Sequence, residues 1–125
     1  MPKNHLLCWL WLLLLGQFTE FAFGEEPSRF VRTQAGELPI ILSAPHGGKM
    51  GSEKRFGKKP YFVIARSHRK YLDPNRPPEI AYEDADAKPV YDVYHSALSN
   101  SCREVQQKFH KGLLLDIHGQ GTAKD

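Results

Sequence analysis

The chain has 125 residues, a net charge of +3, 41% hydrophobic residues and 25% charged residues. This is the composition of an ordinary folded protein with a single domain, and it excludes collagen, coiled coils, long disorder and disulfide-rich miniproteins. A net charge of +3 does not by itself indicate nucleic-acid binding, and we expect no nucleic-acid partner.

The N-terminus has the pattern of a secretory signal peptide. Residues 6–15 are apolar throughout (LLCWLWLLLL), Lys3 and His5 precede them, and Ala22 and Gly24 follow with the spacing of a cleavage site. A membrane-spanning helix needs about 20 apolar residues, which this run does not reach. An uncleaved membrane anchor is therefore the less favoured alternative, and we expect no stable membrane span.

Cleavage would leave residues 25–125 as a chain that is secreted or held in the lumen of the secretory pathway. Of the two cysteines, Cys8 would leave with residues 1–24, so Cys102 alone would remain. A single thiol cannot form an intramolecular disulfide. We therefore expect the domain to be stabilised by its core, by a metal or by a partner.

Three strands are predicted in the first half of the remaining chain. Residues 30–33 (FVRT) alternate between apolar and polar, and residues 38–44 (LPIILSA) include a continuous apolar stretch. Gly36 lies between these two segments, which predicts a hairpin. Residues 61–65 (YFVIA) are apolar throughout, which is typical of a strand covered on both faces of a sheet.

A long helix is predicted over residues 86–111, because apolar residues recur there at steps of three and four. Basic residues in its last turn and Gly112 directly after it are typical of a helix C-terminus. Residues 113–117 (LLLDI) predict another strand. Strand, helix and strand in this order indicate a right-handed βαβ unit, so the predicted fold class is α/β with helix 86–111 as the crossover.

Two histidines follow predicted strands at equivalent places. His46 comes after residues 40–44 and His118 after residues 113–117, and a glycine follows each. Because ligands of open α/β sheets bind beyond the carboxyl ends of strands, we expect both imidazoles at one rim. Imidazole is a good zinc ligand, so the two histidines predict a divalent metal site. The alternative is that they are loop histidines beside turn glycines, without a metal. Asp116 either orients the His118 ring or ligates directly.

A charged loop over residues 66–78 is the second candidate site. Arg76 has the planar fork that grips a carboxylate through two hydrogen bonds, and Asn75 can donate beside it. Asp73 can hold the loop by pairing with Arg69. The alternative is a solvated, charged turn, which composition alone favours because Asp-Pro and Arg-Pro-Pro are turn formers.

Four blocks in order resemble the N-formylglutamate amidohydrolase family. They are residues 43–48 (SAPHGG), 61–65 (YFVIA), 68–76 (HRKYLDPNR) and 113–119 (LLLDIHG). The resemblance covers most of residues 38–121. It implies an incomplete mixed sheet from a fold similar to that of zinc carboxypeptidase-like (phosphorylase/hydrolase-like) enzymes. It also implies metal-dependent hydrolysis of the amide bond of a small acidic N-acyl amino acid.

The resemblance also implies roles for individual residues. His46 and His118 correspond to the two histidine ligands of a divalent metal, with zinc as the first candidate. Arg69, Asn75 and Arg76 correspond to the residues that hold the substrate carboxylate. The metal would act as a Lewis acid on the acyl carbonyl.

The chain departs from the family pattern in two places. The family has a longer, partly helical stretch with an Asp-x-x-Thr motif where this chain has residues 49–60, and it continues past the block that contains Asp116. Glu53 is the acidic residue left in that segment, so Glu53 and Asp116 are the catalytic candidates. We expect residues 25–125 to be a partial domain. The alternative to an enzyme is a non-catalytic, secreted, truncated isoform or binding module.

Overall fold

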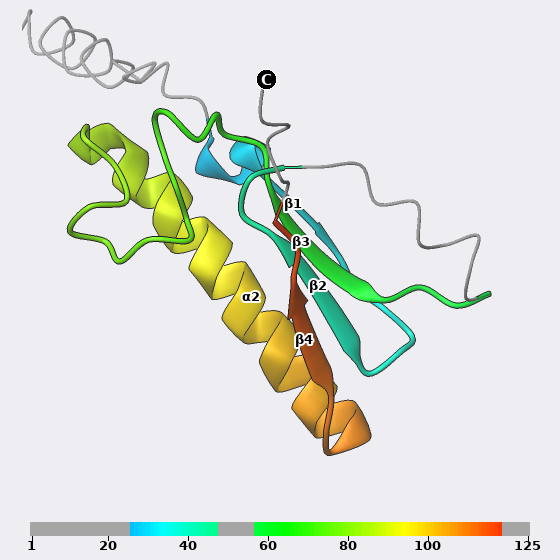
Figure 1. The fold of residues 1–125 in the computed structure, drawn as a ribbon. Coiled ribbons are helices and arrows are strands. Elements are labelled where there is room, and N and C mark those ends of the chain that lie inside the picture. Colours follow the sequence, from blue (N-terminus) through cyan, green and yellow to red (C-terminus); the bar gives the residue numbers. More distant parts are fainter. Residues whose placement is uncertain (1–25, 48–56, 119–125) are drawn as a thin grey trace, which may run out of the picture.

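The computed structural model describes residues 26–47 and 57–118 and shows a mixed α/β fold, in which a long helix packs on a sheet (Figure 1). In chain order its elements are η1 (Pro27–Phe30), β1 (Val31–Gln34), β2 (Ile40–Ala44), β3 (Tyr61–Ala65), η2 (Ala85–Ala87), α2 (Lys88–Phe109) and β4 (Leu113–Asp116). The predicted signal peptide 1–24 and the candidate Glu53 lie outside the described residues.

The order of the strands shows that the predicted hairpin is wrong. The order is β1-β3-β2-β4, and β1 pairs antiparallel with β3, in a register that places Val31 opposite Ala65. β2 lies between β3 and β4 and is parallel to both. The physical reason is burial, because four of the five residues of β2 are buried whereas two of the four in β1 are exposed. A continuously apolar strand suits the sheet interior, and a half-exposed strand suits its edge.

The predicted crossover helix is confirmed. α2 spans Lys88–Phe109 and connects β3 to β4, within two residues of the predicted limits at each end. Both strands are parallel to β2, which lies between them. The second half of the described chain is therefore a βαβ unit with another strand inserted between its two strands.

The predicted glycine cap of α2 is wrong. The helix ends at Phe109 and is capped by His110, which has a left-handed backbone with φ of 64° and whose N–H donates to the carbonyl of Gln106 at 3.0 Å. Gly112 serves a different purpose. A Cβ placed on Gly112 would lie 2.4 Å from Cγ1 of Val105, so only glycine lets the chain turn this closely beneath the helix.

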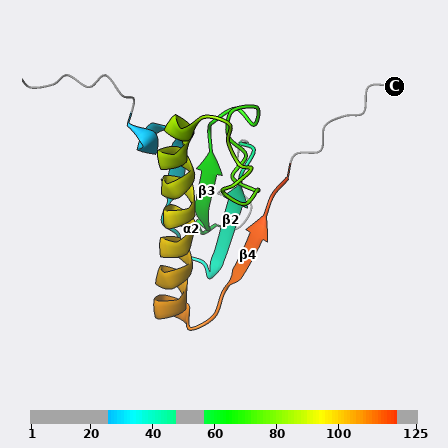
Figure 2. The same cartoon turned by 90° about the vertical axis from the view of Figure 1, so that its left-hand side faces the viewer.

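α2 covers one face of the sheet, as both views of the ribbon show (Figures 1 and 2). The residues buried between helix and sheet are Val31, Ile41, Tyr61, Val63, Ala65, Tyr94 and Val105. Cys102 is partly buried and packs against them. Burying these side chains supplies the main stabilisation of the helix, because isolated helices are marginal in water.

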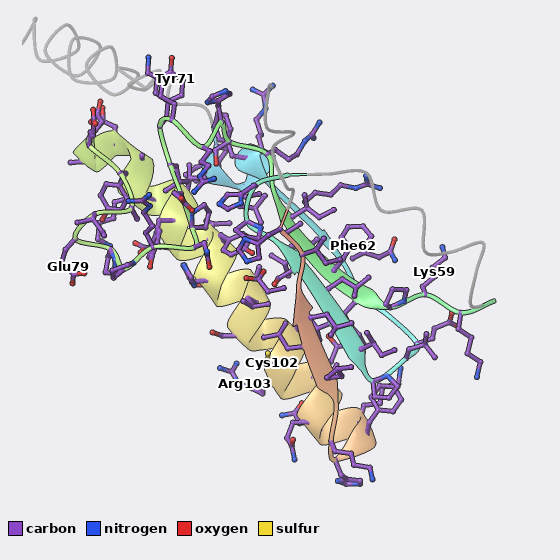
Figure 3. The ribbon with its side chains drawn as sticks, in the orientation of Figure 1. Lys59, Phe62, Tyr71, Glu79, Cys102 and Arg103 are labelled. Carbon is purple, nitrogen blue, oxygen red and sulfur yellow. The ribbon has the colours of Figure 1, made fainter. Side chains whose placement is uncertain are left out.

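The opposite face of the sheet has a second apolar cluster, formed by Leu42, Ala44, Phe62 and Ile64. Phe62 is labelled in Figure 3, and the guanidinium of Arg32 lies 5.1 Å from the centre of its ring. All five residues of β3 are buried, as the apolar sequence of this strand predicts. The edge strand β4 differs, since all four of its residues are exposed. Within the described ranges, no helix is both long and apolar enough to cross a membrane.

Candidate functional site

The candidate site lies where β2 and β4 end. The two strands are parallel, and their register places Ser43 opposite Asp116, so both carboxyl ends lie at the same level. The loop after β2 carries His46 and the residues after β4 carry His118. Their ring centres are 5.3 Å apart with an interplanar angle of 66°. The register of the two strands therefore brings together two imidazoles that are distant in sequence.

Each imidazole is held by one carboxylate. Nε2 of His46 lies 2.9 Å from Oδ1 of Asp73, and Nε2 of His118 lies 2.8 Å from Oδ2 of Asp116. The other oxygen of Asp116 accepts a hydrogen bond from the hydroxyl of Ser43. In the structure Asp116 therefore makes the orienting contact with the His118 ring. Holding Nε2 in both rings leaves Nδ1 as the nitrogen that can bind a ligand.

Asp73 is the centre of a network of hydrogen bonds. Oδ1 accepts from the backbone N–H of Asn75 at 3.1 Å as well as pairing with His46. Oδ2 accepts from Nε of Arg69 at 3.1 Å and from Nε of Arg76 at 3.2 Å. Burial by itself would raise the pKa of Asp73, but the hydrogen bonds from His46, Asn75 and Arg69 lower it to about 2. The carboxylate is therefore charged throughout the physiological pH range.

α2 fixes the loop that carries these residues. His95 Nε2 lies 3.1 Å from the carbonyl oxygen of Pro74, and the hydroxyl of Tyr91 donates to the carbonyl oxygen of Arg76 at 3.0 Å. The rings of Tyr91 and His95 also pack together, with centres 4.3 Å apart. The polar face of the helix thus holds the 73–76 loop against the ends of the strands.

The two arginines remain accessible despite their bonds to Asp73. The side chains of Arg69 and Arg76 are 60% and 52% exposed, and Nε is the atom of each that binds Asp73. Both line a pocket of about 190 Å³, which also has Asp73 in its wall. Asn75 lines a separate pocket of about 160 Å³, together with Asp116. Asp73 therefore lines the arginine pocket, while its neighbour Asn75 lines the pocket beside the strand ends.

Tyr94 lies beneath the strand ends and lines the same 160 Å³ pocket as Asp116. It is only 2% exposed. Burial and the charge of Asp116 raise the pKa of Tyr94 to about 12, while a hydrogen bond with Ser43 acts in the opposite direction. Tyr94 therefore stays protonated and neutral beside Asp116.

The free ring nitrogens of His46 and His118 are of the type that binds zinc, but they provide only two ligands among the described residues. His46 and His118 each have one ring nitrogen fixed by a carboxylate, which is the usual arrangement of histidines that bind zinc. Residues 26–47 and 57–118 hold no group of three His, Cys, Asp or Glu side chains that could bind a metal ion. A catalytic zinc typically has three protein ligands. Glu53, the candidate for an acidic role, is not among the described residues.

The structure brings the other predicted site residues into one chain of contacts. His118 lies beside His46, His46 pairs with Asp73, and Asp73 binds Arg69 and Arg76. The predicted Arg69–Asp73 pair is confirmed. Sequence reasoning did not find the contact between Asp73 and His46, because the two are separated by 27 positions and no local pattern links them.

Two further residues of the site, Ser43 and Tyr94, were also not predicted. Ser43 stands as a single hydroxyl in an otherwise apolar strand, and it is 2% exposed. Since a buried hydroxyl needs a partner, this isolation was an available signal. Tyr94 has no such signal, because its position is indistinguishable from the apolar stripe of α2. Comparisons of the chain with protein-family models, with curated proteins and with solved structures find no match.

Proposed function

We propose that the chain is a metal-dependent amidohydrolase, similar to N-formylglutamate amidohydrolase, that cleaves the amide of a small acidic N-acyl amino acid. The observation that carries this proposal is the pair His46 and His118, at adjacent parallel strand ends with ring centres 5.3 Å apart. Each has Nε2 held by a carboxylate and Nδ1 left for a ligand. The same proposal takes the fold as part of a zinc carboxypeptidase-like domain that is secreted after removal of residues 1–24.

A divalent metal held by His46 and His118, with zinc as the first candidate, would supply Lewis-acid polarisation of the acyl carbonyl. The protein's own contribution is to fix the two rings. Asp73 and Asp116 set the ring orientation, and Ser43 in turn fixes Asp116. Asp116 and Glu53 remain the candidates for moving a proton.

The substrate carboxylate is assigned to the arginine side of the site. Arg69 and Arg76 are more than half exposed, and their other guanidinium nitrogens would grip a carboxylate while Nε stays on Asp73. Asn75 lies on the neighbouring side of Asp73 and is exposed. In this arrangement a substrate spans Asp73, with its charged end at the arginines and its amide towards the histidines.

The test is the release of formate from N-formylglutamate by purified residues 25–125, with and without added Zn²⁺, Mn²⁺ or Co²⁺. We expect turnover that depends on metal, is lost in His118→Ala and is retained in the matched control His110→Ala. His110 is exposed and caps α2 through its backbone rather than its side chain. Equal rates in the two variants, or no turnover with any of the metals, would contradict the proposal.

A non-catalytic binding module is the second candidate. It is supported by two observations on the described residues: they hold no group of three His, Cys, Asp or Glu side chains that could bind a metal ion, and Arg69 and Arg76 are accessible. This function predicts that N-acetylglutamate binds without metal, with affinity lost in Arg76→Ala and retained in Arg103→Ala. Titration calorimetry of metal-free protein measures this. Binding without any turnover would favour the module over the enzyme.

A further inference from the structure

A second cavity lies beside the N-terminal end of α2, apart from the two histidines. Its volume is about 380 Å³, which is within the range of small-molecule pockets. Its apolar wall consists of Phe30, Tyr71, Leu72, Ala87 and Val90. These residues come from η1, from the loop after β3, and from η2 with the first turn of α2, so the cavity is formed where three separate segments meet.

Three of the six polar residues that line this cavity are acidic, against one lysine. Glu83, Asp84 and Asp86 line it together with Lys70, His68 and Ser67. The carboxylate of Asp84 is already engaged within the chain, because it accepts a hydrogen bond from the backbone N–H of Asp86 at 2.9 Å. Among the described residues, the carboxylates of Glu83 and Asp86 have no hydrogen-bond or ion-pair partner. Two carboxylates without an ion-pair partner in the described part of the chain therefore border a cavity with an apolar wall.

Lys70 also lines the cavity, and within the described ranges it forms no ion pair with these carboxylates. Nζ of Lys70 lies 5.7 Å from the centre of the Tyr71 ring. Tyr71, which is labelled in Figure 3, projects outward from the fold. Tyr71 is 67% exposed, so this contact is at the outer surface. Ser67 also lines the cavity, and its hydroxyl is the one buried side-chain polar atom without a partner in the described part of the chain.

We propose that this cavity binds a small organic cation, with the apolar body of the ligand against Leu72 and Val90 and its ammonium group between Glu83 and Asp86. An apolar wall with a few charges at the mouth suits a ligand that is part hydrocarbon and part cation. Three carboxylates against one lysine give the lining a net negative charge, which favours a cation over an anion. The site does not depend on the proposed hydrolase activity. Of its residues, Lys70 and Glu83 also line the arginine pocket, and Asp86 does not.

The probe is 2-phenylethylammonium, and its matched comparisons are the neutral 2-phenylethanol and the anion 3-phenylpropionate. The readout is a set of amide chemical-shift changes in the ¹⁵N-labelled, metal-free protein. We expect saturable binding of the cation with a dissociation constant of about 1 mM or lower. The shifts should cluster at Ser67, Leu72 and Val90. The alcohol should bind about tenfold more weakly, and the anion should not bind.

Two exposed carboxylate substitutions test the charge requirement with little risk to folding. Asp86→Asn and Glu83→Gln should each weaken binding of the cation by about threefold to tenfold. Asp92→Asn is the matched control, since Asp92 is exposed on the same helix and outside this cavity. Binding of the cation that does not saturate, equal affinity for the alcohol, or unchanged affinity in Asp86→Asn would overturn the proposal.

Discussion

His46 and Asp73 are 27 positions apart in the sequence, and Nε2 of His46 lies 2.9 Å from Oδ1 of Asp73. This contact joins the loop after β2 to the charged loop after β3. Oδ2 of the same carboxylate binds Arg69 and Arg76. One buried aspartate therefore sets the orientation of a candidate metal ligand and the position of both candidate substrate-binding arginines.

Asp73→Asn should destabilise the fold, because it removes the charge that four donors share while keeping the size of the side chain. We expect the free energy of unfolding to fall by about 1–3 kcal/mol, measured by urea denaturation. Asp92→Asn is the control, since it breaks the exposed Lys88–Asp92 pair and should cost less than about 0.5 kcal/mol. Equal effects of the two substitutions would contradict the central role of Asp73.

The contribution of Asp73 should disappear in acid. Its pKa is lowered from 3.8 to about 2, so its stabilisation is complete above pH 3.8 and is lost as the pH falls through 2. The difference in unfolding free energy between the metal-free wild type and Asp73→Asn should therefore shrink between these pH values. This difference in unfolding free energy should fall by about 2 kcal/mol, measured by denaturation at several pH values. A difference that does not change with pH would refute this prediction.

Asp116→Asn should lower the pKa of Tyr94. Burial and the charge of Asp116 raise that pKa to about 12, so removing the charge leaves burial as the main cause of the increase. NMR of ¹³Cζ-labelled tyrosine should follow the titration. Asp92→Asn is the control, because the charge of Asp92 raises the pKa of Tyr91 but does not contribute to the raised pKa of Tyr94. A Tyr94 pKa that is unchanged in Asp116→Asn would show that the two groups do not interact.

Gly112→Ala should destabilise the chain, because a Cβ there would lie 2.4 Å from Cγ1 of Val105 and 3.0 Å from the carbonyl oxygen of Pro39. We expect a loss of about 1–3 kcal/mol in unfolding free energy, measured by thermal denaturation. Combining it with Val105→Ala should cost less than the sum of the two single changes, by about 0.5–1 kcal/mol. Strictly additive effects would indicate that the clash with the Pro39 backbone dominates.

The sequence by itself determined the elements of the structure that depend on local pattern. The period of apolar residues located α2 to within two residues, and the apolar run of β3 predicted burial on both faces. The strand endings also indicated that His46 and His118 share a rim, since parallel strands present their carboxyl ends together. The Asp73–Arg69 pair was also predictable from local pattern, because its partners are only four positions apart in the sequence.

The tertiary structure decided which strands are neighbours and which distant side chains meet. The predicted hairpin between β1 and β2 is wrong because burial, rather than closeness in sequence, places β2 inside the sheet. Gly112 looked like a helix cap, yet its close approach to Val105 depends on how the chain turns back beneath α2. The His46–Asp73 contact likewise arises from the folding of two loops against one helix. Local pattern encodes secondary structure, whereas contacts between distant residues are fixed only when the core packs.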